Sequence, residues 1–407
     1  MKLQMSSVRI KIKAVGGAWT SKGNSSRIKS RALFPGVKGR DQILGFRVLR
    51  PAAATAPARR EEMGLLVPLS QISPVLVGII VVVFSSALWL LSYIVEWTQK
   101  LDQGSGTTTP SFLENPSSLE KVRCPSVFGP PEKYLSLVIP AFDEEARLPL
   151  TLDETLRYLE GRAAVNKAFT YEIIIVDDGS RDNTVKVAFD YIKKYKMDNV
   201  RLIKQGVNCG KGAAVTKGAL CSRGELILML DADGATKITN LEKLENAILT
   251  YGEKIQKQKS LRDPSVENIF DVPLVACGSR AHLEQQALAT RKWYRNFLMK
   301  GFHLCVLLAA GSGIRDTQCG FKMFTRSAAQ QLFINLRLTR WCFDVELLYL
   351  CKRLGIPALE IAVNWTEIPG SKLRMTSILH MLFELLLIRI GYGFNVWKIH
   401  QNLVQTS

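Results

Sequence analysis

The chain has 407 residues, 47% of them hydrophobic, and a formal net charge of +18, which suits one large domain with appendages. Residues 1–60 hold fourteen Lys and Arg against a single acid, Asp41, so most of the excess charge lies in one segment. That concentration, without any recognition motif, argues against a basic nucleic-acid-binding fold and against nucleic acid as a partner.

Residues 1–62 form a basic extension that we predict to be disordered. The extension is rich in Arg, Ser and Lys and almost free of acids, a composition shared by organelle transit peptides and disordered basic tails. Met63 supplies an alternative start directly before an apolar segment, so the extension is either dispensable or an artefact of the assigned start. The eight cysteines are scattered without a C-x-x-C pair, which predicts reduced thiols, as in the cytosol, rather than a disulfide framework.

An apolar stretch follows, with no charged residue between Glu62 and Glu96. Its core at 72–95 is long enough to cross a hydrocarbon layer of about 30 Å as a helix. We therefore predict a transmembrane anchor over 70–97. A buried core helix and a cleaved signal peptide are the alternatives, but the run is longer than the apolar part of a usual signal peptide.

Residues 98–132 are rich in Gly, Ser, Thr and Pro and are predicted to be a linker. A domain over 133–376 follows, in which short runs rich in Val, Ile and Leu predict strands buried on both faces. These strand candidates are 134–141, 171–179, 200–205, 225–234 and 272–280. Helix candidates lie between them at 145–160, 181–196, 211–222 and 239–256. Repeated β-α units predict an α/β fold, Rossmann-like, with a mostly parallel sheet and helices on both faces.

Acidic residues follow three of these strands, at the edge where ligands bind in such sheets. Asp231 and Asp233 stand one residue apart, so strand periodicity sends both carboxylates to the same side. There they can hold one hard cation together with substrate phosphates, which favours a nucleotide diphosphate as ligand. The alternative is a pair of loop acids that cap the next helix.

Two further acid pairs, Asp143–Glu144 and Asp177–Asp178, follow neighbouring strands. Helix capping would explain one of these acids but not all four, so the cluster also suggests hydrogen bonds to a base and ribose. The glycine-rich stretch 206–218 is one residue short of P-loop spacing. A helix that begins there with Lys211 can still bind an anion through backbone N–H groups, the alternative being a tight packing turn.

Eight motifs occur in order: VIPAFDEE, VDDGSRDNT, NCGKGAA, DADG, GSR, RDTQCGFKMF, RWCFDVELL and EIAVNWTEIPGSK. Together they resemble the family 2 glycosyltransferases of the GT-A fold, over the chain from about residue 70 to the C-terminus. Single motifs are shared with many sugar transferases. The last three, with the N-terminal anchor, most resemble the members that glucosylate dolichyl phosphate.

The resemblance implies that glucose passes from UDP-glucose to dolichyl phosphate with inversion, giving dolichyl β-D-glucosyl phosphate and UDP. Such a product is the glucose donor for lipid-linked oligosaccharide assembly in protein N-glycosylation. The resemblance also implies Mg²⁺ or Mn²⁺, and a single-pass protein of the endoplasmic reticulum membrane whose catalytic domain faces the cytosol. Counted with residues 1–62, the positive-inside rule favours the opposite orientation. The functional alternatives are a GDP-mannose-dependent dolichyl-phosphate mannosyltransferase and a non-catalytic, membrane-anchored nucleotide-sugar binder.

The resemblance further assigns site residues by motif. The implied metal ligands are Asp231 and Asp233. The implied nucleotide site consists of Pro140, Ala141, Asp143, Glu144, Asp177, Asp178, Lys211, Asp231, Ala232 and Asp233. Arg280 of GSR matches a position close to the donor or acceptor phosphates, and Asp344 of FDVE is the candidate for a general base or a site-ordering acid. A helix-terminal acid is the alternative for Asp344, because a phosphate monoester is already anionic at pH 7 and needs no strong base.

An anionic acceptor needs cations, for which the candidates are Arg315, Lys322, Arg340, Lys372 and Arg374. Arg337 stands where processive polysaccharide synthases carry the Gln of Q-x-x-R-W, and this departure argues against a polymerase. Two apolar segments, 292–311 and 377–397, carry a few charges at helical spacing, as membrane-interface helices do. Buried packing helices are the alternative. We predict a membrane-interface helix and tail over 377–407, with membrane lipid as a partner.

Overall fold

The structure is a computed structural model that describes residues 74–105, 112–118, 120–260, 268–283, 301, 305–307, 311, 313–368 and 375–400. The chain divides into two units, Met1–Gln71 and Ile72–Ser407. All of the first unit, and with it the predicted basic extension over 1–62, lies outside the described residues. The described residues therefore all belong to the second unit.

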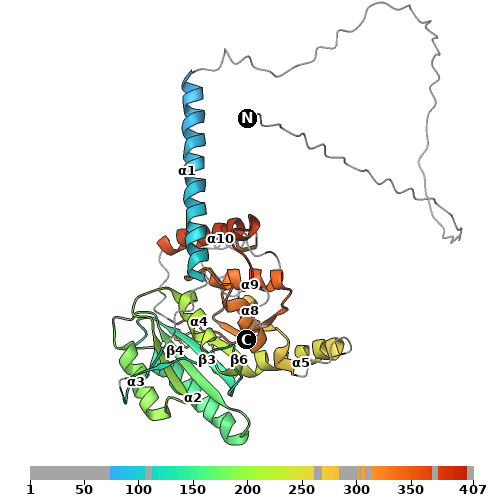
Figure 1. Ribbon diagram of the computed structural model, residues 1–407. Coiled ribbons are helices and arrows are strands. Elements are labelled where there is room, and N and C mark those ends of the chain that lie inside the picture. The colour runs from blue at the N-terminus through green and yellow to red at the C-terminus, as the bar shows by residue number, and fades with distance from the viewer. Residues whose placement is uncertain are drawn as a thin grey trace, which may run out of the picture. The chain divides into compact units, whose positions relative to one another are not determined.

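A nine-stranded sheet is the centre of this unit, in the order β2-β1-β5-β4-β3-β6-β8-β7-β9. Figure 1 shows its central strands β4, β3 and β6 side by side. The strands are β1 Phe112–Glu114, β2 Lys121–Arg123, β3 Lys133–Ala141, β4 Tyr171–Asp177, β5 Val200–Lys204, β6 Gly224–Leu230, β7 Val275–Ser279, β8 Phe321–Thr325 and β9 Ala358–Ala362. The four central strands, β5, β4, β3 and β6, are mutually parallel, and within the sheet only β1 and β8 run against the common direction. The predicted α/β class with a mostly parallel sheet is confirmed.

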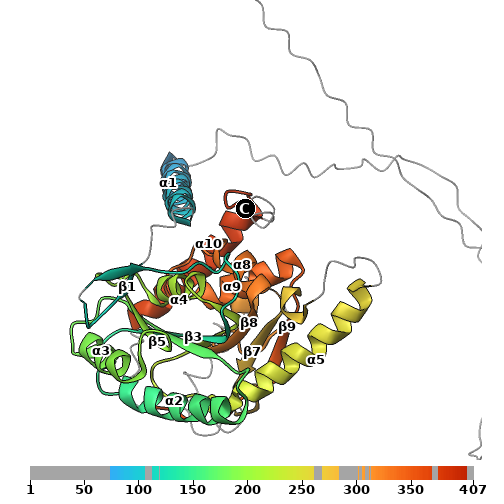
Figure 2. The same ribbon diagram turned by 60° about the horizontal axis from the view of Figure 1, so that its bottom comes forward.

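Helices cover both faces of the sheet, as predicted (Figure 2). Their bounds are α1 Pro74–Ser105, α2 Leu148–Val165, α3 Thr184–Tyr195, α4 Lys211–Leu220, α5 Leu241–Ser260, α8 Arg326–Phe333, α9 Phe343–Leu354 and α10 Met375–Gly393. One core joins the sheet to α2, α3 and α5, and the other joins it to α4, α8, α9 and α10. Successive strand residues serve opposite cores: in β3, Leu137 and Ile139 face the first and Val138 the second.

Several elements differ from the sequence-based expectations. The stretch expected to be a linker contains the end of α1 and the short strands β1 and β2, which form one edge of the sheet. Helix α2 begins at Leu148 rather than at 145, consistent with Pro149 in its first turn, where a missing N–H costs nothing. Strands β8 and β9 were not expected, and β8 inserts between β6 and β7.

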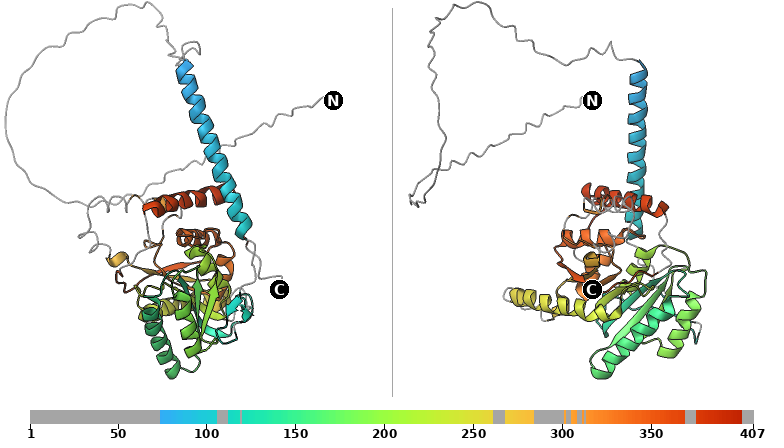
Figure 3. Two further views of the ribbon diagram at one scale, coloured as in Figure 1. Left: turned by 90° about the vertical axis from the view of Figure 1, so that its left-hand side faces the viewer. Right: turned by 180° about the vertical axis from the view of Figure 1, so that it is seen from behind.

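Helix α1 has 32 residues, and several of its large apolar side chains are exposed, among them Val82, Phe84 and Trp89. Within the described part of the chain, no helix meets the length and apolarity needed to cross a membrane. The C-terminal part of α1 contacts α10 (Figure 3). It also contacts the segment after α10, where Trp397 Nε1 donates to the Thr98 carbonyl at 2.8 Å. The Trp97 ring packs edge-on against Phe383, with centroids 6.1 Å apart.

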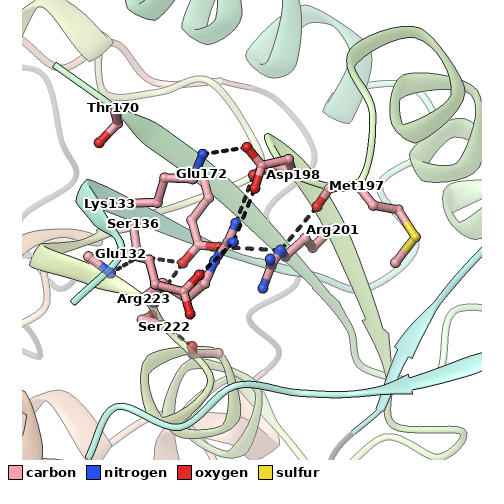
Figure 4. Close-up of polar contacts among 12 residues, drawn as sticks. Glu132, Lys133, Ser136, Thr170, Glu172, Met197, Asp198, Arg201, Ser222 and Arg223 are labelled. Atoms are coloured by element: carbon pink, nitrogen blue, oxygen red, sulfur yellow. Dashed lines mark hydrogen bonds and ion pairs between the residues drawn. The ribbon is translucent and has the colours of Figure 1, made fainter. Parts of the chain in front are cut away.

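A network of charged side chains occupies the amino-terminal edge of the central strands (Figure 4). Its centre is Glu172 of β4, which is fully buried. The Glu172 carboxylate accepts hydrogen bonds from Ser136 Oγ at 2.6 Å and from Arg223 Nε at 2.9 Å, and it lies 3.4 Å from Arg201 Nε. Asp198, largely exposed, pairs with the outer side of Arg223. Buried ion pairs thus connect the central strands at their amino-terminal edge, whereas the predicted site residues stand at the carboxyl-terminal edge.

Candidate active site

Three parallel strands bring their acidic residues to one edge of the sheet, as predicted. Strand β3 ends at Ala141, β4 at Asp177 and β6 at Leu230, so the acids that come after them are neighbours across the sheet. Asp231 is the first residue after β6, and the start of the antiparallel β8 pairs with the end of β6. This pairing brings Gly320 against Asp231. A Cβ at Gly320 would lie 1.9 Å from Asp231 Oδ2, so the position accepts no side chain.

Asp231 forms an ion pair with Lys211, the first residue of α4. The Lys211 Nζ lies 2.6 Å from Asp231 Oδ1, and both side chains are partly exposed, 21% for the lysine and 32% for the aspartate. Burial alone would lower the pKa of Lys211, but the negative charges of Asp231 and then Asp344 raise it above its ordinary value. Lys211 is therefore a charged ammonium group within the acidic cluster.

Asp233 completes the D-x-D pair. Its Oδ1 accepts a hydrogen bond from the backbone N–H of Ala235 at 2.9 Å. Burial raises the pKa of Asp233 above its ordinary value, and the neighbouring charge of Asp231 raises it further. A shared counter-ion would relieve this repulsion.

The donor set of this pair suits a hard divalent cation. Within the described residues no group of three or more His, Cys, Asp or Glu side chains could hold a metal ion. Mg²⁺ requires no such group, because it commonly takes one or two carboxylates and completes its shell with waters and substrate phosphates. The two carboxylates at Asp231 and Asp233 fit that pattern.

Asp344, in the first turn of α9, is buried and bonded to a buried lysine. Its Oδ1 accepts from Lys322 Nζ at 2.6 Å, and the same ammonium donates to the Cys319 carbonyl at 2.7 Å. Burial raises the pKa of Asp344 despite the opposing effect of Lys322. Lys322 lies inside β8 with no exposed surface, so its prediction as a ligand of the acceptor phosphate is wrong. A lysine in a strand is buried here because its partner is supplied by another element.

The acids after β3 and β4 shape the loops at this edge. Asp178 accepts hydrogen bonds from the backbone N–H groups of Cys209 and Gly210, at 2.7 and 2.9 Å, and so holds the glycine-rich turn. Asp177 is buried and accepts from the Ser180 N–H at 3.2 Å. The predicted contacts of these acids with a nucleotide stay predictions, but each has a structural task in the protein itself.

Glu144 and its neighbours are likewise engaged. The Glu144 carboxylate receives two hydrogen bonds from the Arg147 guanidinium, at 2.6 and 2.7 Å, and Asp143 Oδ1 accepts from the Arg181 N–H at 2.7 Å. Ala232 is buried between the two metal-ligand candidates, and its carbonyl accepts from Thr151 Oγ1 at 2.8 Å. Pro140 and Ala141 close β3 beside β4. The acidic edge is thus braced from α2.

The amino end of α4 is a packing turn rather than an open anion site. The N–H groups of Gly212 and Ala213 donate to the carbonyls of Arg340 and Thr339, at 3.2 and 2.9 Å. A Cβ at Gly210 would lie 2.5 Å from the Thr339 oxygen, and φ at Gly210 is +103°, so glycine is required twice over. Of the two interpretations drawn from the sequence, the tight packing turn describes the start of α4. Lys211 can therefore reach an anion with its side-chain ammonium group, but the N–H groups of Gly212 and Ala213 are already bonded.

Arg280 stands at the carboxyl end of β7. It donates two side-chain hydrogen bonds to Asp316, at 2.7 and 2.8 Å, and its guanidinium lies 5.4 Å from the centre of the Trp365 ring. Sequence reasoning did not single out Asp316 or Trp365, although both lie within quoted motifs. Their place within the motifs could have marked Asp316 and Trp365 as site candidates. Their contacts with Arg280, however, are visible only in the structure.

The remaining acceptor candidates have different surroundings. Arg315 and Arg340 are exposed, whereas Lys372 and Arg374 lie outside the described residues. Arg337, at the Gln position of the synthase motif, is buried and donates to the carbonyls of Asn335 and Lys398. Arg337 therefore supports the C-terminal packing rather than a ligand.

Comparison with known proteins identifies relatives over most of the chain. Residues 136–333 match the family model described as glycosyl transferase family 2. The chain is 50% identical over 283 residues to a dolichyl-phosphate β-glucosyltransferase of Homo sapiens, covering 69% of this chain and 83% of that protein. It is 42% identical over 316 residues to one of Dictyostelium discoideum, covering 77% and 88%. Among solved structures, glucosyl-3-phosphoglycerate synthase from Mycobacterium tuberculosis with UDP is similar at 15% identity and a TM-score of 0.41, over 64% and 81% of the two chains.

Proposed function

Because the chain belongs to the dolichyl-phosphate β-glucosyltransferases within glycosyl transferase family 2, we propose that it transfers glucose from UDP-glucose to dolichyl phosphate with inversion. The products are dolichyl β-D-glucosyl phosphate and UDP. One observation carries the use of a nucleotide-sugar donor: Asp231 and Asp233 stand side by side at the carboxyl edge of the sheet, with Lys211 bonded to the first. This edge is where α/β sheets bind their ligands.

The donor half of the reaction requires charge stabilisation on the departing UDP. A divalent cation, Mg²⁺ or Mn²⁺, held by Asp231 and Asp233 would supply positive charge to the diphosphate when bound. Lys211 is the protein's own cation at the same place, 2.6 Å from Asp231 Oδ1. Arg280 is held in one orientation by Asp316 and presents a second fixed cation at the end of β7. A cation fixed in this way, as Arg280 is, stabilises charge without reorganising during the reaction.

The acceptor half needs little proton chemistry. A phosphate monoester has a second pKa of about 6, so its oxygen is a nucleophile at pH 7 without losing a proton to the enzyme. That oxygen attacks the glucose anomeric carbon opposite to UDP, so the new bond forms as the bond to UDP breaks and the configuration inverts. We assign Asp344 to ordering the site, because its Oδ1 is bonded to Lys322 and its side chain is buried.

The acceptor phosphate requires an exposed cation close to this edge. We assign that task to Arg340, whose backbone carbonyl caps α4 next to Lys211 and whose side chain is exposed. A guanidinium can bind a phosphate through two parallel hydrogen bonds. Arg315 is the second exposed candidate, one residue before the Asp316 that holds Arg280.

The lipid part of the acceptor calls for a membrane. Helix α10 has two apolar faces: Met381, Leu385 and Ile388 are buried, whereas Leu379 and Leu386 are exposed. We propose that this exposed face lies in the membrane interface and that α1, from the charge-free sequence before Glu96, anchors the chain. The proposed location is the endoplasmic reticulum membrane, single-pass, with the catalytic domain in the cytosol, where nucleotide sugars are made.

The activity is tested by incubating the purified full chain with dolichyl phosphate and radiolabelled UDP-glucose or GDP-mannose, with and without EDTA. We expect labelled lipid from UDP-glucose alone, lost with EDTA, and lost in the Asp233→Ala variant. Label from GDP-mannose instead would identify a mannosyltransferase. UDP binding without any transfer would identify a non-catalytic binder.

The membrane proposals have their own tests. In sealed microsomes the catalytic domain should be digested by added protease, and Asn364 of the Asn-Trp-Thr sequence should carry no glycan. Protection from protease, or a glycan at Asn364, would overturn the cytosolic orientation. For α10, replacing the exposed Leu379 and Leu386 by Ser in a chain lacking residues 1–97 should reduce co-flotation with liposomes, and unchanged flotation would contradict the interface assignment.

A further inference from the structure

Lys211 pairs with one oxygen of the Asp231 carboxylate. That oxygen, Oδ1, lies 2.6 Å from Lys211 Nζ and is itself buried. A Cβ at Gly320 would lie 1.9 Å from Oδ2 and 2.6 Å from Oδ1, so the glycine leaves the whole carboxylate uncovered on that side. A divalent cation at Asp231 therefore meets an ammonium group already bonded to its ligand. Two cations at one carboxylate repel each other, so each weakens the binding of the other.

A second carboxylate lies near Lys211 but is already engaged. The charge of Asp344 raises the pKa of Lys211, after Asp231, so Asp344 belongs to the same cluster. Its Oδ1, however, is bonded to Lys322, and the Cys319 carbonyl anchors the same ammonium. Lys322 carries the same charge as Lys211 and is held by Asp344 and the Cys319 carbonyl, so Asp344 is already neutralised by another lysine. The charge of Lys211 also lowers the pKa of Asp233, so the acid of this cluster that remains for a released Lys211 is the other candidate metal ligand.

We propose that Lys211 is a displaceable counter-ion that makes binding of the divalent cation depend on the nucleotide. Without nucleotide, Lys211 neutralises Asp231 and opposes the cation. The diphosphate of UDP offers Lys211 a new anionic partner, so the lysine leaves Asp231 as the nucleotide arrives and the cation takes its place. This inference rests on the proposed metal-dependent use of UDP-glucose and adds an order to it: the cation alone binds weakly, and cation and nucleotide bind cooperatively.

The test measures Mn²⁺ affinity rather than turnover. Free Mn²⁺ is followed by electron paramagnetic resonance in titrations of the detergent-purified full chain, with and without saturating UDP. The variants are Lys211→Met, which keeps the length of the side chain, and Lys237→Met as the control. Lys237 also forms an ion pair, with Glu154 at 2.9 Å, but both side chains are more than a third exposed.

In the unaltered chain, UDP should tighten Mn²⁺ binding by about a hundredfold, because both direct coordination and the release of Lys211 contribute. In Lys211→Met, Mn²⁺ alone should bind about tenfold more tightly than in the unaltered chain, since no ammonium competes. The tightening by UDP should shrink to about tenfold. Lys237→Met should match the unaltered chain in both titrations.

Three results separate the possible failures. If Lys211→Met tightens Mn²⁺ binding equally with and without UDP, Lys211 merely repels the cation, and the exchange of partners is refuted. If the substitution changes neither affinity, the inference is refuted as well. If the unaltered chain binds no Mn²⁺ even with UDP, the proposed metal-dependent function itself fails. Should Lys211→Met unfold at a lower temperature, Lys211→Gln provides the same comparison with a polar side chain.

Discussion

Replacing Glu172 by Gln removes the charge at the centre of the amino-terminal network while keeping the side chain's size (Figure 4). Glu172 is fully buried, 2.9 Å from Arg223 Nε and 3.4 Å from Arg201 Nε. Breaking a buried ion pair by removing one partner costs about 3–5 kcal/mol. Because the Gln carbonyl can still accept one of the hydrogen bonds, we expect a loss near the lower end, about 3 kcal/mol.

The assay is thermal unfolding of the detergent-purified chain at pH 7 and a fixed scan rate. At about 2–4 °C per kcal/mol, Glu172→Gln should lower the midpoint by at least ~6 °C. The control is Asp198→Asn in the same network, whose side chain is 63% exposed and whose loss should cost no more than about 1 kcal/mol. UDP binding should be unchanged in both variants, because the network lies at the edge opposite to the site. Equal midpoints for the two variants would refute the argument from buried charge.

The remaining predictions concern single positions. Gly320→Ala forces a carbon to within 1.9 Å of Asp231 Oδ2, so the rate of glucose transfer should fall by about 100-fold. The control is Gly161→Ala, whose added carbon meets nothing within 4 Å. This variant should keep the full rate of transfer and gain about 0.5–1 kcal/mol of stability. Burial raises the pKa of Glu346 from 4.5 to about 7. The contribution of Glu346 to the free energy of unfolding is therefore fully present below pH 4.5 and is lost as the pH rises through 7. Glu346→Gln should flatten the unfolding midpoint over that range, and an unchanged slope would contradict this. Lys322→Met leaves the buried carboxylate of Asp344 without its cation. The substitution should lower the free energy of unfolding by about 3–5 kcal/mol in the same thermal assay, and an unaltered midpoint would contradict the buried pair.

The central strands could be predicted because burial on both faces leaves a direct mark on composition. Apart from Glu172, the run of β4, Tyr171–Asp177, is apolar until the acid at its end, and the parallel arrangement follows from the helices between such strands. Strands β1 and β2 left no such mark, since each has three residues and β2 is exposed throughout. β1 is placed in the sheet by its pairing with β5, and β2 by its pairing with β1, and no local pattern encodes either contact.

The site could be predicted as a set of acids but not as a set of pairs. D-x-D spacing sufficed to bring Asp231 and Asp233 together, because the period of a strand is local. Lys322 was assigned wrongly because a lysine in sequence predicts an exposed cation, and its partner Asp344 lies on another element, 22 residues away. Asp178 shows the same limit: its hydrogen bonds to the turn at Cys209 depend on how β4 and α4 meet.

The pair between Arg280 and Asp316 has a consequence for how this family can diversify. The two residues are 36 positions apart, yet they meet where the chain leaves the sheet after β7 and where it returns for β8. Their bidentate contact ties the two ends of that excursion together. The placement of β7 against β8 therefore does not depend on the intervening chain alone, so changes in the length of that chain should leave the two strand ends together.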